Sequence, residues 1–219
     1  MSLYRILSAL LSYPEQELID ALPDIDAALA DYPEVRQQLS PLTRFLASQP
    51  LIDLQENYVG TFDRSPAHSL HLFEHIHGES RDRGPAMVDL LHEYQKRGFE
   101  PFGDEDLGAE LPDYLPLFLE FLSQLPDDEA QGFLDDAIHV AAAVGERLAR
   151  HHSPYTCLFE VLRHLSSVTP LPLVEPPVRD MDELLETFGP GADGSEPLLK
   201  PRPGAAQTVQ FYPRQAAGH

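Results

Sequence analysis

Apolar residues recur at helical spacing along most of this chain, and the pattern is clearest in residues 127–151. One stripe of that segment holds apolar residues at steps of four, three and seven: Leu134, Ile138, Ala141 and Leu148. Acidic residues open the segment, and arginines and histidines close it, which suits the two ends of a helix dipole. A long amphipathic helix is therefore predicted over residues 127–151.

Shorter segments with the same period predict further helices, which proline and glycine residues separate from one another. These helices are predicted at residues 3–12, 15–22, 34–48, 52–62, 70–77, 86–97, 114–125 and 153–165. Pro23 is interpreted as the stop of the second one. No segment alternates apolar and polar side chains over the length of a strand. The predicted fold class is therefore all-α, with a single helical bundle domain.

The composition of the chain changes after residue 167. Nine of the 21 prolines lie between Pro170 and Pro213, and the apolar residues in this region follow no period. We therefore predict a helical domain at residues 1–168 and a flexible, Pro/Gly-rich tail at residues 169–219. One short amphipathic segment at residues 180–188 is a candidate helix within that tail.

The chain is strongly acidic, with 36 Asp and Glu against 15 Lys and Arg and a formal net charge of -21. Such a field repels polyphosphates, so no nucleic-acid partner is expected. It attracts a basic peptide segment instead. Arg81 and Arg83 stand out against this acidic background, and pairing with neighbouring carboxylates is the favoured interpretation.

Cysteine content and the N-terminus restrict where the protein works. Cys157 is the single cysteine, which excludes an internal disulfide or an iron–sulfur cluster held by this chain alone. Residues 1–13 have the pattern of an amphipathic helix, and nowhere do about 18 apolar residues follow one another. We expect no membrane insertion and a cytoplasmic location.

Candidate chemistry is concentrated in residues 58–84, where aromatics, histidines and arginines gather. One hypothesis is a metal site, because three of the histidines fall on one helical face and a Glu-x-x-His step resembles that of ferritin-like di-metal proteins. It predicts a helical metal-binding protein or a di-metal oxidoreductase. The side chains that it uses are His68, His71, Glu74, His75, His77 and, from an Asp-x-x-His step elsewhere, His139.

The second hypothesis for this segment is a surface that binds a helical peptide. Tyr58, Phe62 and Phe73, with Leu70 nearby, have the spacing to line an apolar groove, although packing in the core explains the same spacing. The sequence has neither a nucleotide-binding glycine motif nor a nucleophile elbow. We therefore expect a binding module rather than an enzyme, with no metal held by the chain.

The run SLHLFEHIHGESRDRG at residues 69–84 resembles the NarJ-type family of nitrate reductase molybdenum cofactor assembly chaperones, within the wider TorD and DmsD group. The likeness continues through AMVDLLHEYQKRG at 86–98, LPDYLPLFLEF at 111–121 and LLSYP at 10–14, and it covers most of residues 1–167.

This resemblance implies an all-helical, non-enzymatic chaperone. Its implied partner is the apo-catalytic (alpha) subunit of respiratory nitrate reductase, which it binds through the N-terminal leader segment of that subunit. The resemblance also implies that the chaperone assists loading of the molybdenum–guanine dinucleotide cofactor, delays docking to the membrane anchor, and binds no cofactor stably itself.

The acidic signature of the family falls on Glu110, Pro112, Asp113, Tyr114 and, at a different spacing from the general pattern, Glu120; Tyr114 stands in place of a histidine. Tyrosine keeps an aromatic body and a polar tip but loses the charge change near neutral pH. Asp113 has two interpretations, a cap on the helix predicted from residue 114 or a contact with the peptide. The predicted partner-binding residues are Tyr58, Phe62, Leu70, His71, Phe73, Glu74, His75, His77, Glu79, Arg81, Arg83, Glu110, Asp113 and Tyr114.

Overall fold

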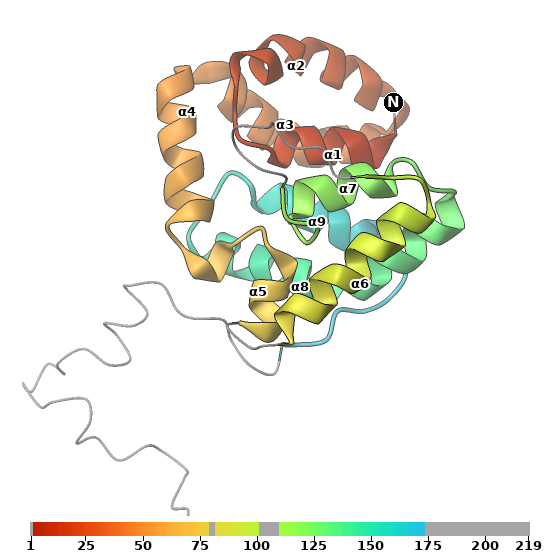
Figure 1. The fold of residues 1–219 in the computed structure, drawn as a ribbon. Helices are drawn as coiled ribbons and strands as arrows, with labels where there is room; N and C mark the ends of the chain where they lie inside the picture. Colours follow the sequence, from red (N-terminus) through yellow and green to blue (C-terminus); the bar gives the residue numbers. More distant parts are fainter. Residues whose placement is uncertain (1, 79–81, 101–109, 174–219) are drawn as a thin grey trace, which may run out of the picture. The chain divides into compact units, whose positions relative to one another are not determined.

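Helices pack on one another throughout this computed structural model, which describes residues 2–78, 82–100 and 110–173 (Figure 1). The α-helices are α1 (Leu3–Leu11), α2 (Gln16–Ala28), α3 (Pro33–Ser48), α4 (Leu51–Tyr58), α5 (Leu72–His77), α6 (Arg83–Lys96), α7 (Leu115–Leu122), α8 (Asp127–Arg150) and α9 (Thr156–Leu165). Short 3-10 turns lie at Leu29–Asp31 and Pro66–His68, and a π-helical turn lies at Val59–Asp63. No strand occurs in these ranges, and the all-α prediction is confirmed.

The long helix α8 packs along α9 through the predicted apolar stripe. Every residue of that stripe is buried: Leu134, Ile138, Ala141 and Leu148. Close approach of the two helices depends on Gly145, because a Cβ atom placed there would lie 2.6 Å from the Cβ atom of Phe159. The hydrophobic stripe and the glycine together fix how α8 and α9 pack.

Helix α7 is apolar on almost all sides and packs against α1. Six of its eight residues are buried, as expected for a helix surrounded by others. The Ser8 hydroxyl of α1 donates a hydrogen bond of 2.7 Å to the carbonyl oxygen of Pro116 in α7. The backbone that leads into α7 therefore has a fixed position relative to α1.

Two of the predicted helix boundaries are wrong in an informative way. Helix α2 continues through Pro23 to Ala28, because Leu22 and Ile25 on either side of the proline are buried. Packing of this apolar face outweighs the hydrogen bond that proline cannot donate. The helix predicted over 52–62 changes from α to π geometry at Val59, and Phe62 in that turn is buried.

The first residues of the predicted tail contact α8. The backbone N–H of Leu171 donates to Nδ1 of His139 at 3.0 Å, and Leu173 packs against the core. Residues 174–219, which include the candidate helix at 180–188, lie outside the described residues. None of the helices in the described ranges has the length and apolar content needed to cross a membrane.

Candidate partner-binding site

Two motifs that lie far apart in the sequence are joined by backbone hydrogen bonds. The N–H of Leu72 donates to the carbonyl of Asp113 at 3.0 Å, and the N–H of Leu115 donates to the carbonyl of Leu70 at 2.8 Å. His71 and Tyr114 thereby face each other in an isolated antiparallel bridge. The histidine-rich segment and the acidic signature thus form one structural unit.

Asp113 is the polar centre of this unit, and its side chain is fully buried. One carboxylate oxygen accepts the backbone N–H of Phe73 at 3.0 Å, and the other accepts Nδ1–H of His71 at 3.3 Å. Of the two interpretations of Asp113, the cap on the following helix is wrong, because α7 has no side-chain cap and Asp113 caps the start of α5 instead. The hydrogen bond to Asp113 raises the pKa of His71 above its ordinary value, against the opposing effect of burial.

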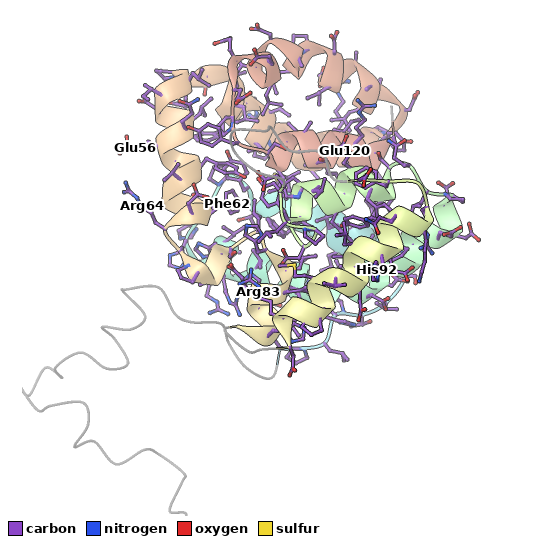
Figure 2. The ribbon with its side chains drawn as sticks, in the orientation of Figure 1. Glu56, Phe62, Arg64, Arg83, His92 and Glu120 are labelled. Atoms are coloured by element: carbon purple, nitrogen blue, oxygen red, sulfur yellow. The ribbon has the colours of Figure 1, made fainter. Side chains whose placement is uncertain are left out.

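Aromatic side chains line the neighbouring space between α4 and α7. The Tyr58 hydroxyl lies 3.0 Å from the Leu11 carbonyl and 3.0 Å from the Tyr114 hydroxyl. A carbonyl can only accept, so Tyr58 donates to Leu11 and Tyr114 donates to Tyr58. The ring of Phe62 lies 4.9 Å from that of Tyr58. Phe62, labelled in Figure 2, belongs to the π-helical turn that follows α4, and its side chain is buried.

These side chains enclose a cavity of about 300 Å³, which we call the α4–α5 cavity. Its lining comprises Tyr58, Phe62, Asp63, Pro66, Ser69, Leu70, His71, Glu74 and Tyr114. Six of these residues were predicted from the sequence to bind a partner. Asp63, which is exposed at the rim, was missed. Asp63 is a single carboxylate at a helix end. Nothing in the local sequence marks it as a binding residue, because only the fold brings Tyr114 close to it.

Comparison with known proteins identifies the family of this chain. The family model described as "Nitrate reductase delta subunit" matches residues 29–160, more than half of the chain. The chain belongs to this family. The matched region includes α3 to α8 and therefore both motifs that form the α4–α5 cavity.

Several relatives of this chain are named as assembly chaperones of nitrate reductase. "Probable nitrate reductase molybdenum cofactor assembly chaperone NarW" of Escherichia coli K12 is 42% identical over 167 residues, which is 76% of this chain and 68% of the relative. "Nitrate reductase molybdenum cofactor assembly chaperone NarJ" of the same strain is 36% identical over 221 residues, covering 97% and 86%. A probable NarJ of Bacillus subtilis is 32% identical over 161 residues, covering 73% and 85%. The sequence-based recognition of a NarJ-type chaperone rather than an enzyme is confirmed.

In this delta subunit family member, the histidines do not converge as the metal hypothesis requires. His68, His71 and His75 do not share one helical face, because α5 begins only at Leu72. His68 Nδ1 bonds the Thr61 carbonyl at 3.2 Å. Within the described ranges, no group of three or more His, Cys, Asp or Glu side chains is arranged to hold a metal ion.

His75 instead has a structural role in the interior. Its Nε2 lies 2.7 Å from the Ser69 carbonyl, and its Nδ1 lies 3.2 Å from the Arg147 guanidinium. The carbonyl requires a donor and the guanidinium requires an acceptor, so His75 is neutral with its hydrogen on Nε2. Burial lowers its pKa to about 4, consistent with this neutral form.

The remaining predicted residues lie around α5 and α6. Arg83 forms the expected ion pair, at 3.1 Å from Glu74, and Figure 2 labels it at the start of α6. The rings of Phe73 and His77 meet edge to face at 5.7 Å. Glu110 is exposed. The predicted residues Glu79 and Arg81 lie outside the described ranges.

Proposed function

We propose that this chain is a cytoplasmic chaperone for the apo-catalytic subunit of a respiratory nitrate reductase. It binds the N-terminal leader segment of that subunit and holds the subunit accessible while the molybdenum–guanine dinucleotide cofactor is inserted. Docking to the membrane anchor is delayed until loading is complete. The names of the NarW and NarJ relatives support the choice of nitrate reductase and of cofactor assembly. The chaperone itself retains no cofactor.

The observation that carries the leader-binding part of this proposal is the chemistry of the α4–α5 cavity. Its walls are aromatic and aliphatic, and carboxylates of Asp63 and Glu74 lie among its lining residues. Peptide-binding grooves in proteins combine apolar area with a few polar groups that fix orientation. An amphipathic leader helix with arginine or lysine beside its apolar face has the matching chemistry.

Acidic residues around this cavity give the leader a preferred direction of approach. The charges of Glu110 and Asp63 both contribute to raising the pKa of Tyr114, after the larger effect of burial, which places them in its electrostatic environment. The overall charge of -21 adds a long-range attraction for a basic segment. Such a field increases the association rate more than it increases affinity.

Asp113 and Tyr114 shape the cavity in different ways. Asp113 is buried and bonded on both oxygens, so it positions His71 and the start of α5. Tyr114 lines the cavity directly and is positioned by its hydrogen bond to Tyr58. We therefore assign peptide contact to Tyr114, and positioning of the cavity wall to Asp113.

Association kinetics with a synthetic leader peptide test this proposal. The double substitution Asp63→Lys with Glu110→Lys is expected to slow association about fivefold at low salt, because it reverses the charge at the cavity rim. The matched control, Asp24→Lys with Asp31→Lys, makes the same change in net charge on exposed residues of α2 and the turn that follows it. Equal association rates for the two double variants would contradict a leader site at this cavity.

A further inference from the structure

Helix α6 is held at its two ends and only loosely in between. At its start, Arg83 pairs with Glu74 of α5. Near its end, Tyr94 is the one buried residue of the helix, and its hydroxyl donates to the Pro112 carbonyl at 2.6 Å. Arg97, directly after the helix, lies 2.8 Å from Glu129 of α8. Between these two ends, Leu90 packs against the core but is only partly buried, and a hollow remains beneath the helix.

That space is a cavity of about 520 Å³ between α6 and the helices α5, α7 and α8, which we call the α6 groove. Its volume falls in the range of about 300 to 1,000 Å³ that is usual for ligand sites. The apolar part of its lining includes Phe73, Ile76, Leu90, Phe118, Phe133 and Val140. Ile76 remains 53% exposed at the mouth of the groove. A contiguous apolar lining that stays open to water in this way is a feature of binding surfaces.

The unpaired charges at the rim of the α6 groove are negative. Glu93 is paired with Lys96 and with Arg97. Asp89 of α6 and Asp136 of α8 also line the groove, and neither has a hydrogen-bond or ion-pair partner among the described residues. Basic groups on the flank of a bound helix therefore find a carboxylate on α6 and another on α8 without breaking an existing pair.

Helix α5 separates the α6 groove from the α4–α5 cavity. Leu70, His71 and Glu74 line the cavity on one side, whereas Phe73 and Ile76 line the groove on the other. No residue lines both spaces. The two sites are therefore able to hold different segments at the same time.

We propose that the α6 groove is a second docking site, which binds a partner helix with bulky apolar side chains on one face and basic residues along its flank. The apolar lining accepts side chains at the i, i+3 and i+4 spacing of such a helix. Asp89 and Asp136 select a basic flank over an acidic one. This inference stands whether or not the leader segment occupies the α4–α5 cavity.

The probe that tests this site is a synthetic, fluorescently labelled helical peptide with leucines on one face and lysines on its flank. Fluorescence anisotropy is expected to give saturable binding to the full chain, and a twin peptide with glutamate in place of lysine should bind at least about tenfold more weakly. A scrambled peptide of the same composition, without an apolar face, controls for attraction to the acidic surface. Equal binding of the scrambled peptide would overturn the proposal.

Variants at the groove locate the probe. Ile76→Asp puts an unpaired carboxylate in the apolar wall and is expected to weaken probe binding about tenfold. Ile52→Asp is the matched control, because Ile52 is an exposed isoleucine on α4 that is 69% exposed and outside the groove. Asp89→Lys with Asp136→Lys should weaken binding further than Asp24→Lys with Asp31→Lys. If Ile76→Asp and Ile52→Asp changed probe binding equally, the assignment of the probe to the α6 groove would be wrong.

Competition distinguishes this site from the leader site. Unlabelled leader peptide, at a concentration that just saturates its own site, is expected to leave the labelled probe bound, because the cavity and the groove share no lining residue. Displacement of the probe by the leader peptide would overturn the proposal of a separate site and place the leader in the α6 groove instead.

Discussion

The Asp113 carboxylate accepts the backbone N–H of Phe73, 40 residues earlier in the chain, at 3.0 Å. This single hydrogen bond caps α5 from outside and joins the two motifs by which the sequence resembles its family. It also explains why Asp113 can be buried without an arginine or lysine partner among the described residues, since a backbone N–H and His71 occupy its two oxygens. The wall of the α4–α5 cavity therefore depends on a residue that does not line it.

Substitution of Asp113 is expected to destabilise the protein in a graded way. Asp113→Ala leaves the Phe73 N–H and the His71 ring without their buried acceptor, which should lower the free energy of unfolding by about 2 kcal/mol. Asp113→Asn keeps an oxygen for Phe73 and should cost less. In an NMR titration, the pKa of His71 should fall in Asp113→Asn, because the negative charge that helps to raise it is gone. If urea denaturation showed the alanine variant to be more stable than the asparagine variant, that result would contradict this cap.

Acid should destabilise the fold through His75. Burial lowers the pKa of His75 to about 4, so between that pH and about 6.5 the unfolded chain binds a proton that the folded protein does not. The stabilising effect of the neutral ring is complete above about pH 6.5 and is lost progressively as the pH falls toward 4, by an amount on the order of 3 kcal/mol.

The neutral His75 ring is checked by measuring urea unfolding across this pH range for the wild-type chain and for His75→Gln. Glutamine supplies a donor and an acceptor but does not titrate, so its stability should depend less steeply on pH. Identical pH dependence in both proteins would show that His75 does not carry the effect.

Glycine-to-alanine substitutions in α8 should have opposite effects at two positions. Gly145→Ala should destabilise by about 1 to 3 kcal/mol, because its Cβ would approach Phe159 to 2.6 Å and force α8 and α9 apart. Gly132→Ala is the matched control in the same helix, where a Cβ meets nothing within 4 Å. It should stabilise by up to about 1 kcal/mol through helix propensity. Thermal unfolding of both variants gives the comparison, and a stabilised Gly145→Ala would contradict the close packing described here.

Local periodicity was sufficient to predict the helices that pack through one continuous stripe. The stripe that ends at Leu148 is buried as predicted, because a 3.6-residue period reports directly on which face meets the core. It was insufficient at His71, where a helix was predicted and an extended residue is found. The backbone of this segment pairs with residues 113–115, and such a long-range pairing leaves no periodic signal in either segment.

Only the part of the candidate site that leaves a local pattern in the sequence could be predicted. Aromatic residues such as Tyr58 and Phe62 could be selected by composition and spacing, and both line the α4–α5 cavity. Neither of the two interpretations of Asp113 included a cap on α5, because capping rules consider only neighbouring residues, whereas this carboxylate caps across the fold. Asp63 and the whole α6 groove depend on which helix ends the fold brings together, so no local pattern identifies them.

The measurement that tests the central claim most directly is calorimetric titration of the full chain with a synthetic N-terminal peptide of the nitrate reductase catalytic subunit, at low and high salt. We predict saturable one-to-one binding that weakens as salt screens the acidic rim. We also predict that Asp63→Lys with Glu110→Lys weakens binding at low salt more than Asp24→Lys with Asp31→Lys does. Absence of binding to a correctly folded chain, together with a metal ion that survives dialysis in stoichiometric amount, would contradict the leader-binding account.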